Sequence, residues 1–186
     1  MEVLLLIVSM GFGKSTVVKA IVADLVQKVS WSTLVCMGVA LGTAASRLRP
    51  AMMGLAGLIA APLAFRLAKV FHKSVAETLS VDLPSGGMPT ALTLAMIKAI
   101  EYALLGFIIG KLGENSKVGF RGHVLIGLTV GIIFGGSVIV LAVTQSSTTP
   151  PIAALVSRAV NEIIFPVGCS IVLYGAQKLG KRINID

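Results

Sequence analysis

The sequence predicts an all-α, polytopic transmembrane helical bundle with an amphipathic helix at its N-terminus. Of its 186 residues, 55% are hydrophobic and only 13% are charged, about half the charged fraction of an ordinary soluble domain. The mean hydropathy is +0.93, and the apolar residues gather in long stretches separated by short polar ones. So much apolar surface must face lipid. We therefore expect an integral, multi-pass membrane protein whose immediate partner is the lipid bilayer.

The chain length limits the number of crossings. At about 20 residues per crossing, 186 residues allow four to six transmembrane helices in a single bundle. About five apolar segments fit, at residues 29–45, 51–65, 89–110, 124–144 and 152–174. Residues 30–186 are therefore assigned to the transmembrane bundle, with no room for a second soluble domain.

Residues 1–29 form the N-terminal part of the prediction. Val18, Val22 and Val26 repeat at four-residue spacing, which is typical of one face of a helix. Polar residues occupy the opposite face, so we expect an amphipathic helix that lies in the membrane interface or covers the bundle. Trp31, at the start of the first crossing, is expected to anchor it at the interface. If residues 1–29 themselves span, there are six crossings.

Proline and glycine predict where the chain bends or turns. Residues 73–88 contain Pro84 and a Gly-Gly pair, which predicts the one substantial loop. Pro62 and Pro166 fall inside predicted crossings. A proline inside a helix removes one backbone hydrogen bond and displaces the carbonyl four residues earlier. Each of these two residues therefore predicts a helix kink.

Three predicted crossings carry glycines spaced four residues apart, which lets two helix backbones approach closely. These positions are Gly38, Gly42, Gly106, Gly110, Gly127, Gly131 and Gly135. Two interpretations remain open. The glycines either pack helices of one chain against each other, or they form a self-association face in a homo-oligomer.

Four charged residues fall within predicted crossings. Lys98 and Glu101 lie in the third, and Arg158 and Glu162 lie in the fifth; each pair shares a helix face. Leaving each charge in hydrocarbon costs at least about 2.5–3.5 kcal/mol, so we expect all four to face the bundle interior, a partner subunit or a wet cavity. The two crossings run in the same direction. Lys98 can therefore pair with Glu162, and Arg158 with Glu101, near the middle of the membrane.

This charge cluster has two interpretations. Glu101 and Glu162 could line an ion or proton path tuned by Lys98 and Arg158, or all four could form a structural network that holds helices or docks a neighbouring subunit. Pro166 favours the first, because it leaves a free backbone acceptor beside the Glu162 carboxylate. We expect a homo-oligomeric channel or transporter-like protein that moves a small ion or protons. The alternative is a non-catalytic structural or assembly subunit of a larger membrane complex.

Other function classes find little support. The net charge is +8, but no long basic run or aromatic platform accompanies it, so no nucleic-acid partner is expected. Residues 11–16 are similar to a phosphate-binding loop, yet Val8 stands where its first glycine belongs. His72 and His123 lie far apart at helix ends, where headgroup contact is expected. We expect no metal, no cofactor and no enzymatic activity.

Overall fold

The computed structural model describes residues 15–44, 48–80, 91–114, 118–145 and 152–183, which are helical apart from short connections and contain no strand. Its elements are α2 (Ser15–Leu41), the 3-10 turn η1 (Gly42–Ala44), α3 (Arg49–Thr78), α4 (Ala91–Glu114), α5 (Phe120–Thr144) and α6 (Ile152–Ile183). The described part of the chain has five helices that are long and apolar enough to cross a membrane. The predicted all-α helical bundle is confirmed.

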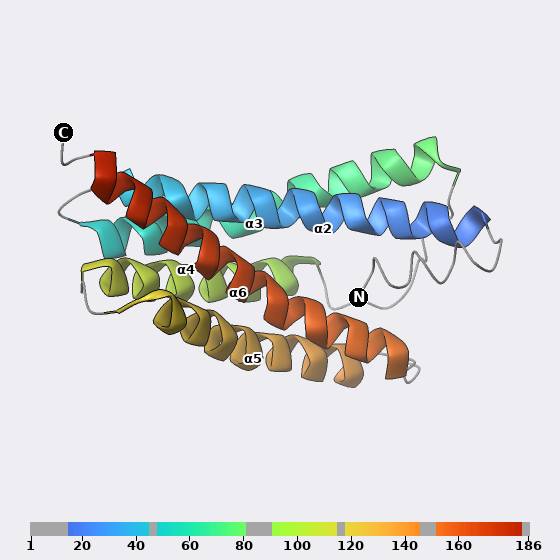
Figure 1. The fold of residues 1–186 in the computed structure, drawn as a ribbon. Helices are drawn as coiled ribbons and strands as arrows, with labels where there is room; N and C mark the ends of the chain where they lie inside the picture. The colour runs from blue at the N-terminus through green and yellow to red at the C-terminus, as the bar shows by residue number, and fades with distance from the viewer. Residues whose placement is uncertain (1–14, 45–47, 81–90, 115–117, 146–151, 184–186) are drawn as a thin grey trace.

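The five helices form two closely packed groups (Figure 1). In the first, α3 packs extensively against both α2 and α4; in the second, α5 packs along α6. Far fewer contacts join the groups, and they come from α4 with α5 and from α6 with α2 and α4. We call this sparsely packed interface between α2–α3–α4 and α5–α6 the seam. Helices α4 and α6 run in the same direction, as the sequence predicted.

Glycines hold the first group together. Gly38 of α2 lies against the Ala60 side chain of α3, and a methyl group at Gly42 would come within 2.6 Å of Met53 Cα. On the other side of α3, Gly106 and Gly110 of α4 lie against Met53 and Pro50, respectively. Such contacts leave no room for a side chain. The close approach of these helices therefore depends on glycine.

The second group is packed in the same way. Methyl groups added at Gly127, Gly131 and Gly135 of α5 would lie 2.7 Å from Val167 Cα, 3.0 Å from Ile163 Cα and 2.7 Å from Glu162 Cβ of α6. The seven glycines singled out from the sequence thus pack within this chain and do not present an open face to a second copy.

Helix α3 extends far beyond the predicted crossing of residues 51–65. It continues to Thr78 because Ala64, Ala68 and Ala76 stay buried on one side, at the four-residue spacing of a helix face. The charged residues of this stretch lie on the exposed side, where Lys73 pairs with Glu77 at 3.7 Å. The predicted loop is therefore wrong for residues 73–78, and residues 81–88 lie outside the described ranges. Pro62 lies inside α3 without ending it.

Trp31 is buried, which contradicts its predicted place at the membrane interface. Its exposed fraction is 7%, and its ring packs edge-on against Tyr102 and Phe165 at centroid distances of 5.3 and 5.4 Å. The reason is that α2 is one continuous helix through the predicted boundary at residue 29, and its apolar span begins at Leu25. Trp31 therefore lies almost two turns inside the span.

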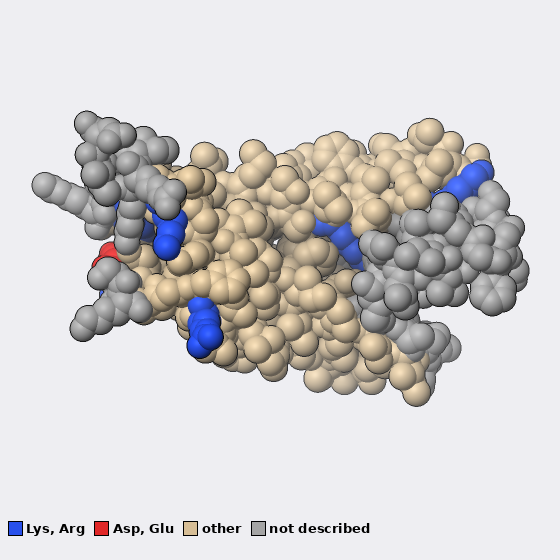
Figure 2. All heavy atoms as spheres, viewed as in Figure 1, with Lys and Arg blue, Asp and Glu red and all other residues tan. Residues whose placement is uncertain are grey.

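The outer surface of the bundle is apolar. Figure 2 shows one face that is almost entirely uncharged, with most of the visible Lys and Arg side chains toward the two ends of the molecule. On α5, for example, Leu125, Ile132, Ile133 and Val140 are each more than half exposed. A water-soluble protein rarely exposes apolar area on this scale. This surface suits lipid contact along the length of the helices.

Candidate functional site

Three charged side chains meet at the seam, where α4 lies next to α6. The Lys98 ammonium of α4 donates hydrogen bonds to Glu101 Oε2 at 2.6 Å and to Glu162 Oε2. Glu101 follows Lys98 by three residues on the same helix, whereas Glu162 belongs to α6. We call Lys98, Glu101 and Glu162 the triad. Through Lys98, the triad links the two helix groups.

The triad is buried unequally. Lys98 is 6% exposed and Glu101 is 0% exposed, whereas the Glu162 side chain retains 15% exposure. Within the described part of the chain, Glu101 Oε1 is buried without a hydrogen-bond partner. An unsatisfied carboxylate oxygen in an apolar interior is costly. Glu162 is thus the more accessible of the two acids, and Glu101 is the acid with an unsatisfied buried oxygen.

The triad lies within the membrane-spanning part of the bundle. The apolar span of α4 runs from Leu92 to Glu114, so at 1.5 Å per residue Lys98 and Glu101 lie about 9 and about 14 Å inside it. The hydrocarbon layer is about 30 Å thick. Glu101 therefore reaches nearly to mid-depth, and Lys98 lies on one side of the centre.

Aromatic rings enclose the triad on the side of α2. The Lys98 ammonium lies 5.6 Å from the centre of the Trp31 ring, in the range of a cation–π interaction. Trp31 itself packs against Tyr102 of α4 and Phe165 of α6. These rings are part of the buried core. They keep the triad in a low-dielectric setting, which strengthens its ionic hydrogen bonds.

Helix α5 packs against the main chain and Cβ atom of Glu162. Gly135 lies against Glu162 Cβ, and the main-chain oxygen of Glu162 would be 3.2 Å from a methyl group at Gly131. Helix α6 continues through Pro166, whose ring prevents the usual hydrogen bond to that oxygen. The carboxylate reaches Lys98 of α4 while the carbonyl faces α5. The two acceptors that the sequence placed side by side thus face different helices.

The structure brings Lys98, Glu101 and Glu162 together. The predicted pair of Lys98 with Glu162 is present, and Glu101 pairs with Lys98 of its own helix, where a pair with Arg158 was predicted. Arg158 is partly buried and lies about one turn before Glu162 on α6.

A second polar contact crosses the seam, and it was not predicted from the sequence. Gln177 of α6 is buried and its amide donates to the Ile109 carbonyl of α4 at 3.1 Å. The available signal was a lone glutamine just beyond the predicted fifth segment of residues 152–174, because polar side chains in membrane helices commonly bond across helices. This hydrogen bond and the triad connect α6 to α4 at two levels along the helices.

The structure also locates His123 and the two cysteines. His123 is buried rather than at the headgroups; its Nδ1 is 3.1 Å from the Gly119 carbonyl and its ring packs on Tyr174 at 4.8 Å. Cys36 of α2 and Cys169 of α6 are free thiols on opposite sides of the seam. Among the residues described, no three His, Cys, Asp or Glu side chains gather as a metal site would require.

In the triad, two carboxylates share one ammonium. Protonation of one acid would leave the other paired with Lys98. Comparison of the chain with protein-family models, curated proteins and solved structures found no match.

Proposed function

We propose that this protein is a small membrane transporter or channel that moves protons or a small cation through a path at Glu101 and Glu162. The observation that carries the proposal is the sharing of the Lys98 ammonium between two carboxylates on opposite sides of the seam. A transport site needs a charged group inside the membrane that can change partners. Ionisable residues at this depth commonly mark ion pathways and proton relays.

Carboxylates are the natural ligands of a proton or a small cation, and the triad places two of them beside one shared ammonium inside the membrane-spanning part of the bundle. Glu162 retains more exposure than Glu101, so it is the acid that loads the cation. Glu101, fully buried on the same helix as Lys98, holds the ammonium when Glu162 releases it.

The seam supplies the movement that such a cycle requires. Loading Glu162 weakens its ionic contact with Lys98, which links the two groups. Helices α5 and α6 are packed together by glycines and share few contacts with the other three, so they can rock as one body. Alternating access in many transporters is rigid-body rocking of one helix group against another around a fixed site.

Flux measurement in liposomes tests the proposal. The purified protein is reconstituted, and proton, Na⁺ and K⁺ entry is followed with enclosed indicator dyes under an imposed potential. We expect flux of one of these ions for the unmodified protein, and loss to the level of protein-free liposomes for Glu101→Gln and Glu162→Gln. The matched control is Glu77→Gln, which removes a carboxylate from an exposed surface pair and leaves flux intact. Unchanged flux in both triad variants would eliminate the path.

The triad also favours a second candidate, a non-catalytic subunit or assembly factor of a larger membrane complex. Both of its acids are matched by a base inside the chain, as a static ion network would also require. The two candidates differ in assembly. The transporter is proposed to form a homo-oligomer through its exposed apolar faces, whereas the subunit co-purifies with unlike chains. Mass measurement of the protein purified in mild detergent separates these outcomes.

A further inference from the structure

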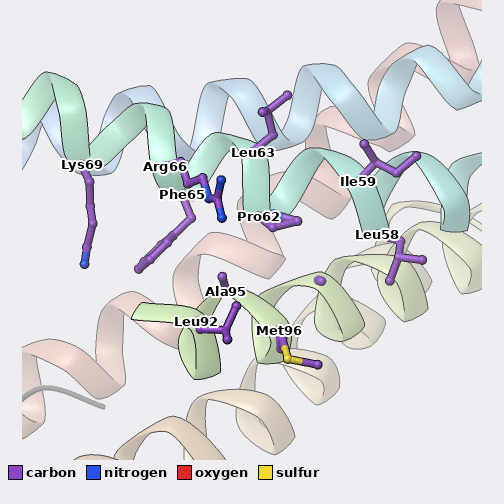
Figure 3. Close-up of a pocket in the computed structure, with 11 residues that line it drawn as sticks. Leu58, Ile59, Pro62, Leu63, Phe65, Arg66, Lys69, Leu92, Ala95 and Met96 are labelled. Carbon is purple, nitrogen blue, oxygen red and sulfur yellow. The ribbon is translucent and has the colours of Figure 1, made fainter. Parts of the chain in front are cut away.

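A groove opens on the outside of the bundle between α3 and α4, away from the triad. Its volume is about 560 Å³, within the range of about 300–1,000 Å³ that is typical of small-molecule sites. Eleven residues line it, and all but Arg66 and Lys69 are apolar. Figure 3 shows Leu58 and Pro62 on the side of α3 toward Leu92 and Met96 of α4, with both cations at one end.

The groove lies where the close contact of the two helices ends. Gly57 of α3 lies directly against the Tyr102 carbonyl of α4, and Gly54 packs against Phe107. Leu58 is the first groove residue beyond this contact, and Pro62 follows one turn later. Beyond Gly57, α3 contains no further glycine. The apolar groove lies along this part of the two helices, on the outside of the bundle.

The depth of the two cations matches a lipid headgroup. At 1.5 Å per residue, Lys69 lies about 30 Å along α3 from Arg49, which equals the hydrocarbon thickness. Arg66 lies about one turn farther into the membrane than Lys69, at one end of the groove. The Lys69 ammonium is held 5.0 Å from the Phe65 ring centre, a cation–π contact that keeps it beside the groove.

We propose that this groove binds an anionic glycerophospholipid. Arg66 and Lys69 hold the phosphate, and one acyl chain lies along Leu58, Leu63 and Met96. Charge complementarity favours this occupant: the groove carries two cations and the whole chain has a net charge of +8. A second copy of the chain would add to this positive charge. The arginine fork also suits phosphate oxygens geometrically.

Lipid titration tests the site. The full protein in neutral detergent is titrated with phosphatidylglycerol, and bound lipid is counted by native mass spectrometry alongside the unfolding temperature. We expect retained phosphatidylglycerol, and roughly thirtyfold weaker binding in Arg66→Gln/Lys69→Gln, because each cation near an anionic surface contributes about a fivefold factor. The control Lys73→Gln/Lys111→Gln removes equal charge from exposed positions outside the groove and keeps the lipid.

A third variant tests the apolar part of the groove. Met96→Trp leaves both cations in place and fills the groove, and we expect this variant also to lose the lipid. Four results would overturn the proposal: equal binding in both double variants, equal binding of phosphatidylcholine, a matching shift with inorganic phosphate alone, or lipid-independent self-association that Met96→Trp abolishes. Phosphate alone would indicate a free-anion site, and self-association would assign the groove to a second copy.

Discussion

Lys98 is the residue on which the buried site depends. It is 6% exposed and donates to two carboxylates, so its ammonium is what allows two acids to remain in an apolar interior. The sequence predicted Lys98, Glu101 and Glu162 as members of one cluster, because the cost of charge in lipid leaves few places for them. It did not predict that Glu101 pairs with Lys98 of its own helix or that Trp31 is buried beside Lys98. Both depend on how the helices pack together.

Replacing Lys98 with methionine should strongly destabilise the protein. Lys98→Met keeps most of the side-chain volume but removes the ammonium that Glu101 and Glu162 share. Removing one partner of a buried ion pair typically costs about 3–5 kcal/mol. We expect a clearly lower unfolding temperature in detergent, measured by intrinsic fluorescence.

Two comparisons isolate the charge effect of Lys98→Met. Lys73→Met removes an exposed lysine and should leave the unfolding temperature nearly unchanged, because exposed pairs contribute at most about 1 kcal/mol. Adding Glu101→Gln to Lys98→Met removes one of the two stranded carboxylates and should restore part of the lost stability. Equal stability of the Lys98 and Lys73 variants would show that the triad is not buried as described.

At the scale of elements, the sequence predicted the helices better than their limits. Hydropathy found all five segments because lipid-facing helices must be apolar along their whole length. It ended α3 too early, since residues 66–78 carry charges on one face and bury only alanines on the other. It also overlooked Gly54 and Gly57, whose contact with α4 is a property of two helices together. Local patterns do not contain such contacts.

The glycine face of α5 gives a prediction at the element scale. A methyl group at Gly135 would lie 2.7 Å from Glu162 Cβ, whereas one at Gly136 meets nothing within 4 Å. Gly135→Ala should therefore push α6 away, cost about 1–3 kcal/mol through overpacking and reduce ion flux by displacing Glu162. Gly136→Ala should be neutral or slightly stabilising. Thermal unfolding and liposome flux of the two variants, side by side, check this prediction; equal behaviour would contradict the packing of α5 on Glu162.

For the whole molecule, the important feature is the division into two helix groups with a sparse seam. The sequence predicted a single bundle and left the use of its glycines open. The structure places those glycines within each group, and the groups are joined by the triad, by Gln177 and by the packing of Trp31 on Phe165. Which helices pack tightly depends on the complementarity of whole surfaces. The proposed transport cycle follows from this division, because it requires α5 and α6 to move against the rest.

Cys36 and Cys169 allow that movement to be tested directly. These thiols lie on opposite sides of the seam, close enough for their side chains to interact, and membrane-permeant iodine oxidises two thiols to a disulfide while it is reduced to iodide. Ion flux is measured in liposomes before oxidation, after it and after reduction, with the disulfide verified by intact mass and Cys36→Ser as control. We predict that the disulfide stops flux, that reduction restores it and that the control is unaffected. Full flux through the cross-linked protein would contradict movement at the seam.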